Sequence, residues 1–262
     1  MTSEPLRIDH SDDGVVVLTL NLPERRNAMT EELTAAWVAA MSALRGDRDA
    51  RVLLVTGAGT AFCAGGDLSW LGVGAGLSVD ELRSRMTPFY RAWLSIRDLE
   101  VPTIAVINGP AVGAGLALAL ACDLRYAAPE ATMSVPFTSL GIHAGMAATW
   151  LLPEVAGLPV ARELLLTGRV VTGEEAVGMG LINRTFPGEG LLAAALGVAR
   201  SIAANAPVAT RLTTVVLRDG HRSMADALRW EALAQPVTMA TEDLAEGIAA
   251  QRDRRPPHFT GR

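Results

Sequence analysis

The chain has 262 residues, of which 50% are hydrophobic, so it can bury a large core as one large domain or two smaller ones. Its net charge of −5 and its pI near 5.4 give no global basic field, which excludes nucleic acid as an expected partner. The polar, acidic N-terminus fits neither a signal peptide nor a transit peptide, and the longest apolar run, 110–122, is too short and glycine-rich to span a bilayer. We therefore expect a cytoplasmic protein without a membrane partner, in which Cys63 and Cys122 are reduced thiols.

The first half of the chain alternates predicted strands and helices. Apolar, β-branched runs predict strands over 15–22, 51–57, 101–109 and 123–128. Helices are predicted after Thr30, which suits an N-cap, over roughly 79–99, and after the glycine-rich turn 113–115. This alternation predicts an α/β fold in which helices pack against a sheet.

Beyond Asn183 the pattern becomes helical. The stretches 191–220, 223–237 and 241–255 are typical of consecutive helices. We therefore place a boundary near residue 190, between an α/β core over 1–190 and a helical C-terminal region over 191–262. A helical appendage of this kind often packs against a neighbouring subunit.

Two glycine-rich loops follow predicted strands. In TGAGTAFCAGGDLSW (56–70), Gly65 and Gly66 can expose backbone N–H groups. In INGPAVGAGLALALACD (107–123), residues 113–115 begin a helix whose first N–H groups have no partner within the helix. Two such donors that converge on one oxygen make an oxyanion hole. Taken singly, each loop is better explained by a tight turn with small residues for close packing, and two such loops after successive strands are more specific without deciding the matter.

Several segments, in order along the chain, carry a family resemblance. These are LNLPERRNAMT (20–30), AFCAGGDL (61–68), INGPAVGAGLALALACDLRYA (107–127), LTGRVVTGEEAVGMGLIN (166–183) and EGIAAQRDRRPPHFTGR (246–262). Together they resemble the enoyl-CoA hydratase/isomerase family of the crotonase superfamily over essentially the whole chain. The resemblance implies a spiral of β-β-α units with a helical oligomerisation region, and a homotrimer or a dimer of trimers. It implies no metal or redox cofactor, since CoA is part of the substrate.

The resemblance also implies a site. Members bind an acyl-CoA thioester and hold its carbonyl between two amides, here those of Gly66 and Ala114, which stabilise an enolate. Further positions that the resemblance places at the substrate or its CoA part are Arg25, Ala64, Asp67, Leu68, Gly113, Arg254 and Phe259. For the two arginines and the phenylalanine, a solvated cation or a packed aromatic ring is an equal alternative. Asp67 is better explained as the residue that holds its loop by accepting local N–H bonds.

The two acids of the family's hydratases are missing. One would stand three residues after Ala114, one helical turn along, where the chain has Ala117. The other would follow Pro136, where the chain has Phe137, and 131–149 contains no carboxylate. His143 is a candidate acid or base, or alternatively a histidine that hydrogen-bonds a turn. Cys63 is expected to be a buried, inert thiol.

Three functions remain open from the sequence. The first is an enzyme that uses the two amides with an unusual proton carrier or with none, for which classical hydration is doubtful. The second is a non-catalytic acyl-CoA-binding protein that kept the amides and lost the acids. The third is a pure assembly role for the same fold.

Overall fold

A computed structural model describes residues 4–67, 76–220 and 223–262 of the chain. Its larger sheet has six strands in the order β1-β2-β3-β4-β6-β9, in which β1 is antiparallel to β2 and the other neighbours are parallel. A smaller sheet has the order β5-β7-β8. The strands are β1 (Leu6–His10), β2 (Val15–Leu20), β3 (Val52–Gly57), β4 (Thr103–Ile107), β5 (Ala111–Val112), β6 (Leu124–Ala127), β7 (Thr132–Ser134), β8 (Val171–Thr172) and β9 (Arg184–Thr185).

The chain winds between the two sheets in a repeating unit. β4 lies in the large sheet, β5 in the small one, and α3 (Ala114–Ala121) follows; β6, β7 and α4 (Ala148–Thr167) repeat this order. In the turn before these, β3 is followed by Cys63, which forms a β-bridge with Ala111 of β5, and then by α2 (Val79–Leu94). The expected spiral of β-β-α units is therefore confirmed.

The core forms where the strands are apolar throughout. Every residue of β3 and β4 is buried, as a parallel strand covered on both faces requires. α1 (Glu31–Gly46) begins at the predicted N-cap, where the Thr30 side chain accepts a hydrogen bond from the Leu33 N–H. α1 and α2 join through Trp37 and Trp93, whose rings stack with centroids 4.9 Å apart. Trp93 is thus a core residue.

The helical stretch predicted over 191–220 is two helices. α6 (Leu191–Ala203) packs against β2, β3 and β4, and α7 (Pro207–Asp219) leaves the sheet. Pro207 has no backbone N–H to donate and therefore starts a helix rather than continuing one. Within the described residues no single helix is long and apolar enough to cross a membrane; the one pair that meets the criterion together, 188–203 and 207–219, is bent by 111°. Because α6 lies beyond residue 190 and still packs on the sheet, the division of the chain near 190 stays a prediction.

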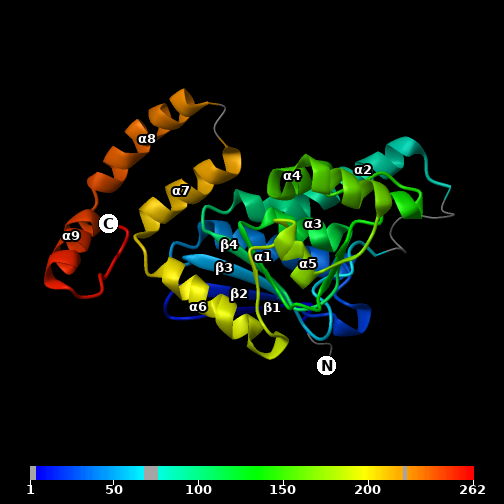
Figure 1. Ribbon diagram of the computed structural model, residues 1–262, viewed down its shortest axis with the longest axis horizontal. Coiled ribbons are helices and arrows are strands. Elements are labelled where there is room, and N and C mark those ends of the chain that lie inside the picture. The colour runs from blue at the N-terminus through cyan, green and yellow to red at the C-terminus, as the bar shows by residue number, and fades with distance from the viewer. Residues whose placement is uncertain (1–3, 68–75, 221–222) are drawn as a thin grey trace.

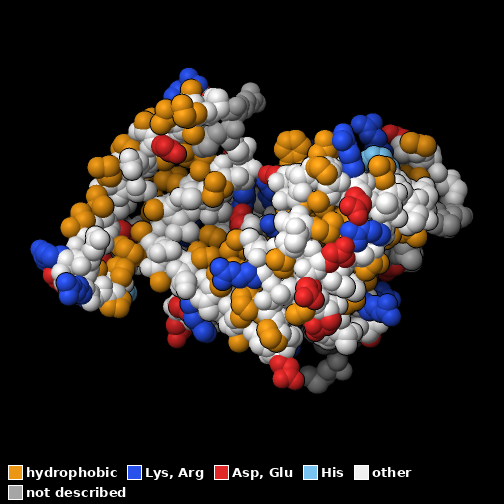
Figure 2. All heavy atoms as spheres, viewed as in Figure 1, with side chains coloured by type: hydrophobic (Ala, Val, Ile, Leu, Met, Phe, Trp, Pro, Cys, Tyr) orange, Lys and Arg blue, Asp and Glu red, His pale blue; other side chains and the backbone are white. Residues whose placement is uncertain are grey.

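The last helices stand away from the sheet at one end of the molecule (Figure 1). They are α7, α8 (Met224–Met239) and α9 (Glu242–Asp253). A partly buried ion pair holds the base of this arm: Arg218 of α7 donates to both Asp123 carboxylate oxygens, at 2.7 and 2.6 Å. α8 itself buries no residue, and Figure 2 shows hydrophobic side chains along it. The large apolar side chains of α8 that are more than half exposed are Met224, Leu228, Leu233, Val237 and Met239.

Candidate functional site

β3 and β4 run side by side and in parallel, from Leu53 opposite Thr103 to Thr56 opposite Val106. Their following loops therefore leave the sheet at the same edge. Asn108 ties the two loops where they begin. Its side-chain oxygen accepts from the Gly57 N–H at 3.1 Å, and its amide nitrogen donates to the Gly59 carbonyl at 3.1 Å.

The two loops then pack main chain against main chain. The Cys63 N–H donates to the Pro110 carbonyl at 3.1 Å, and the Cys63 carbonyl accepts from the Val112 N–H at 3.0 Å. A Cβ atom on Gly115 would lie 2.2 Å from that same Cys63 carbonyl oxygen, and one on Gly65 would lie 3.3 Å from the Ala114 nitrogen. Only glycine at these two positions lets the loops approach so closely.

Asn27 holds this arrangement from a third segment. Its side chain is fully buried, accepts from the Leu22 N–H, and donates to the carbonyls of Ala58 and Ala61 at 2.9 and 2.8 Å. Its φ of 55° lies in the left-handed region, which asparagine tolerates better than most residues. The sequence alone does not point to this residue. An Asn beside two arginines is the available signal, and it predicts a turn rather than a buried clamp.

The amides of Gly66 and Ala114 lie on these adjoining loops. Within the described part of the chain, neither N–H donates a hydrogen bond. Ala114 is the first residue of α3, where the helix dipole is positive, and a Cβ on Gly66 would meet no atom within 4 Å. The amide of Gly113 is already used, since it donates to the Ser134 carbonyl at 2.9 Å. The arrangement offers two unpaired donors to an oxygen with excess negative charge.

The two positions of the missing acids are apolar and close to these amides. Ala117 is fully buried, one helical turn from Ala114. Phe137 is half-buried, and its ring lies 3.6 Å from where a Cβ of Gly113 would stand. An aromatic ring therefore occupies the side of the site where the resemblance expects a carboxylate.

The remaining residues predicted near the amides differ in position. Arg25 and Asp67 form an ion pair, with an N···O distance of 3.6 Å, and the Ala64 N–H donates to the Arg26 carbonyl. Leu68 lies outside the described residues. His143 is exposed, and its Nδ1 lies 2.8 Å from the Ala144 carbonyl oxygen, a contact within the turn itself.

Cys63 is not an activated nucleophile. Its thiol donates to the Asn27 carbonyl at 3.1 Å, and complete burial raises its pKa to about 12. A thiol with such a pKa stays protonated near neutral pH, whereas a nucleophilic cysteine must be a thiolate. The expectation of a buried, inert thiol is therefore confirmed.

Phe259 lies at the opposite edge of the sheet. Arg51, which directly precedes β3, donates to the Phe259 carbonyl at 2.7 Å, whereas the two amides follow the other end of β3. A six-residue strand separates the two places by roughly 20 Å. Arg254 is exposed where α9 ends. Within one chain, the structure does not bring either residue to Gly66 and Ala114.

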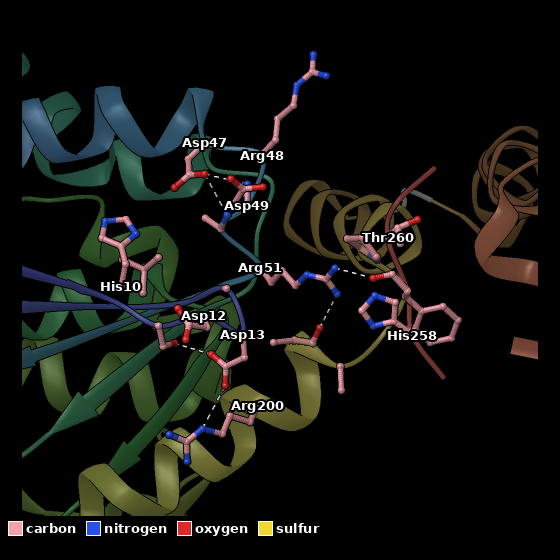
Figure 3. A pocket seen from close by; sticks show the side chains of 18 of the residues that line it. His10, Asp12, Asp13, Asp47, Arg48, Asp49, Arg51, Arg200, His258 and Thr260 are labelled. Carbon is pink, nitrogen blue, oxygen red and sulfur yellow. Dashed lines mark hydrogen bonds and ion pairs between the residues drawn. The ribbon is translucent and has the colours of Figure 1, made fainter. Parts of the chain in front are cut away.

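A cavity of about 660 Å³ opens at this opposite edge (Figure 3). Asp12 and Asp13 border it from the β1–β2 turn, Arg51 from the start of β3, and His258 from the C-terminal tail. The loops with the two amides do not line it. This cavity therefore lies where the C-terminal tail packs against the sheet, and it is not part of the candidate site.

A family model described as enoyl-CoA hydratase/isomerase matches residues 10–262. The chain belongs to the enoyl-CoA hydratase/isomerase family. The match spans the sheet from β2 onward, both loops and the C-terminal arm.

Individual relatives agree with this assignment. The chain is 46% identical over 170 residues to the probable enoyl-CoA hydratase EchA14 of Mycobacterium tuberculosis, an alignment that covers 65% of each chain. It is 34% identical to the human mitochondrial methylglutaconyl-CoA hydratase, over 99% of this chain and 78% of that one. The crystal structure of enoyl-CoA hydratase from Bacillus anthracis superposes with a TM-score of 0.93 at 32% identity, covering 98% of this chain and 100% of that one.

The close approach of the two loops gives a stability prediction. Gly115→Ala places a methyl group 2.2 Å from the Cys63 carbonyl oxygen, so the loops must separate. We expect the free energy of unfolding to fall by about 3 kcal/mol, as for an overpacked core site. Gly197→Ala is the matched control: its site in α6 has no atom within 4 Å of the new methyl group, and we expect a gain of about 0.5 to 1 kcal/mol. Urea unfolding measures both, and equal stabilities of the two variants would contradict the loop contact.

Proposed function

We propose that this chain binds an acyl-CoA thioester and holds its carbonyl oxygen between the amides of Gly66 and Ala114. The observation that carries the proposal is the pair of unpaired N–H groups on adjoining loops, at one edge of a sheet of this family's fold. A thioester carbonyl is an acceptor that fits two such donors, and it becomes a stronger acceptor as negative charge develops on it. The relatives named as CoA-ester hydratases support the choice of ligand class.

The same donors favour reactions that pass through an enolate. Hydration of an enoyl-CoA also needs groups that activate water and protonate carbon, and Ala117 and Phe137 supply neither. Since each such group typically contributes roughly 10²- to 10⁴-fold, we expect ordinary hydration to be slow. A reaction that needs only the enolate is better suited. In the decarboxylation of a malonyl-type thioester, the carbon–carbon bond breaks, CO₂ leaves with its two oxygens, and the electron pair becomes the enolate that water later protonates.

A non-catalytic acyl-CoA-binding protein is the second candidate. The Phe137 ring beside Gly113 favours it, because an apolar wall binds an acyl group without activating water. Both candidates require the same thioester clamp. They differ in whether the bound thioester is consumed.

We also propose that the chain assembles as a homotrimer or a dimer of trimers. The exposed apolar side chains of α8 support this, since a helix with no buried residue gains most from a partner. Assembly would also bring Arg254 and Phe259 to the CoA of a neighbouring subunit, which one chain does not do. Analytical ultracentrifugation of the full-length protein checks the proposal, and a monomer at micromolar concentration would contradict it.

The clamp is tested by comparing butyryl-CoA with its thioether analogue, which lacks only the carbonyl oxygen. Two hydrogen bonds to a neutral carbonyl contribute about 1 to 3 kcal/mol together, so we expect the thioether to bind roughly 5- to 150-fold more weakly. Isothermal titration calorimetry measures both dissociation constants. Equal affinities would contradict the clamp. Two parallel assays separate an enzyme from a binder: loss of enoyl absorbance with trans-2-enoyl-CoA esters tests hydration, and release of CO₂ from malonyl-CoA tests decarboxylation.

A further inference from the structure

Tyr90 of α2 places a hydroxyl group in the turn that follows Phe137. The side chain is half-buried, and its ring packs edge to face against Phe89, with centroids 6.1 Å apart. The hydroxyl oxygen lies against Gly145: a Cβ atom there would be only 2.5 Å from it. The turn therefore has room for this hydroxyl because residue 145 is glycine.

This turn belongs to the candidate site through Phe137. The Phe137 carbonyl accepts from the Ile142 N–H at 3.0 Å, which folds the turn back, and the Phe137 ring packs on Gly113 beside the Ala114 amide. After Gly145 the backbone is left-handed at two successive non-glycine residues, Met146 and Ala147, with φ of 55° and 53°. Such backbone is costly, and it persists where the surroundings hold it in place. The hydroxyl thus contacts, at Gly145, the turn that begins at Phe137.

The hydroxyl group is also available for a ligand. In the part of the chain that the structure describes, it makes no hydrogen bond. Burial raises the pKa of Tyr90 above its usual range, so the group keeps its proton at neutral pH and acts as a donor. When an aliphatic ligand covers such a donor, the donor loses its hydrogen bonds to water. When the ligand has an oxygen atom there, a hydrogen bond to that oxygen replaces the lost ones.

We infer that Tyr90 selects acyl groups that carry an oxygen beyond the thioester carbonyl, such as 3-oxoacyl groups, by donating a hydrogen bond to that oxygen. The inference rests on the proposed function, since the thioester must first be held by Gly66 and Ala114. It assigns Tyr90 a role in specificity. The Phe137 ring has no hydrogen-bonding group, so in this inference the Tyr90 hydroxyl supplies the polar contact to the acyl chain.

The sequence supplies a matched control, because Tyr90 and Tyr126 are the two tyrosines of the chain. Tyr126 lies in β6, where its ring packs against Phe186. We expect the wild-type protein to bind acetoacetyl-CoA more tightly than butyryl-CoA. Tyr90→Phe removes about 2- to 12-fold of this preference, as one hydrogen bond predicts, and Tyr126→Phe keeps it. Calorimetry measures the dissociation constants of both thioesters for the wild type and for each of the two variants, six in all.

A second readout does not depend on the Tyr90→Phe protein being folded. Incorporation of 3-fluorotyrosine gives two ¹⁹F resonances, and the Tyr126→Phe protein assigns both. We expect acetoacetyl-CoA to shift the Tyr90 resonance more than butyryl-CoA does, and to leave that of Tyr126 in place. Binding of both thioesters without a difference at Tyr90 would overturn the inference and leave the proposed function standing. Failure to bind either thioester would overturn the proposed function, and the inference with it.

Discussion

The candidate site depends on one contact, the main-chain packing of the loop 57–66 against the loop 109–115. Three glycines make it possible. A Cβ on Gly109 or Gly115 would lie 2.1 or 2.2 Å from a carbonyl oxygen of the loop 57–66, and a Cβ on Gly57 would lie 2.1 Å from a carbonyl oxygen of its own loop. The buried side chain of Asn27 then fixes the first loop through two of its carbonyls. Because the backbones touch, the amides of Gly66 and Ala114 are held by the fold itself, and little reorganisation is needed when an oxygen binds between them.

The opposite edge of the sheet serves a different purpose, the attachment of the C-terminal arm and tail. Arg218 reaches Asp123 and the carbonyls of Arg97 and Val101, which fixes α7 to the start of β4 and β6. Asp243 of α9 is buried and accepts from two N–H groups of the tail. The arm is thus held firmly at its base while the apolar side chains of α8 stay exposed. The proposed thioester site and the attachment of the arm therefore lie at opposite edges of the sheet.

Regular, strongly patterned elements were predictable from the sequence, and elements that depend on distant contacts were not. The buried strands β2, β3 and β4, the N-cap Thr30 and the spiral of units agree with expectation. α4 was not expected, because Pro153, Gly157 and Pro159 interrupt its pattern, and β1 was not, because four of its five residues are exposed at an edge. Asn27 and Tyr90 could not be identified from the sequence for a related reason: their partners are fixed by tertiary packing. The roles of Gly66 and Ala114, of His143, and the cytoplasmic location stay predictions.

If two backbone amides polarise one thioester carbonyl, they lower the stretching frequency of that carbonyl, which infrared spectroscopy measures. Isotope-edited infrared difference spectra of [1-¹³C]butyryl-CoA would be compared between the wild type and Ala114→Pro. Proline is tolerated at the first position of a helix, which Ala114 occupies in α3, and it removes the N–H. We expect the carbonyl of the thioester bound to the wild type to have a lower frequency than that of the free thioester in water, and we expect a smaller shift with the variant. A frequency unchanged on binding, or an equal shift in both proteins, would contradict this polarisation.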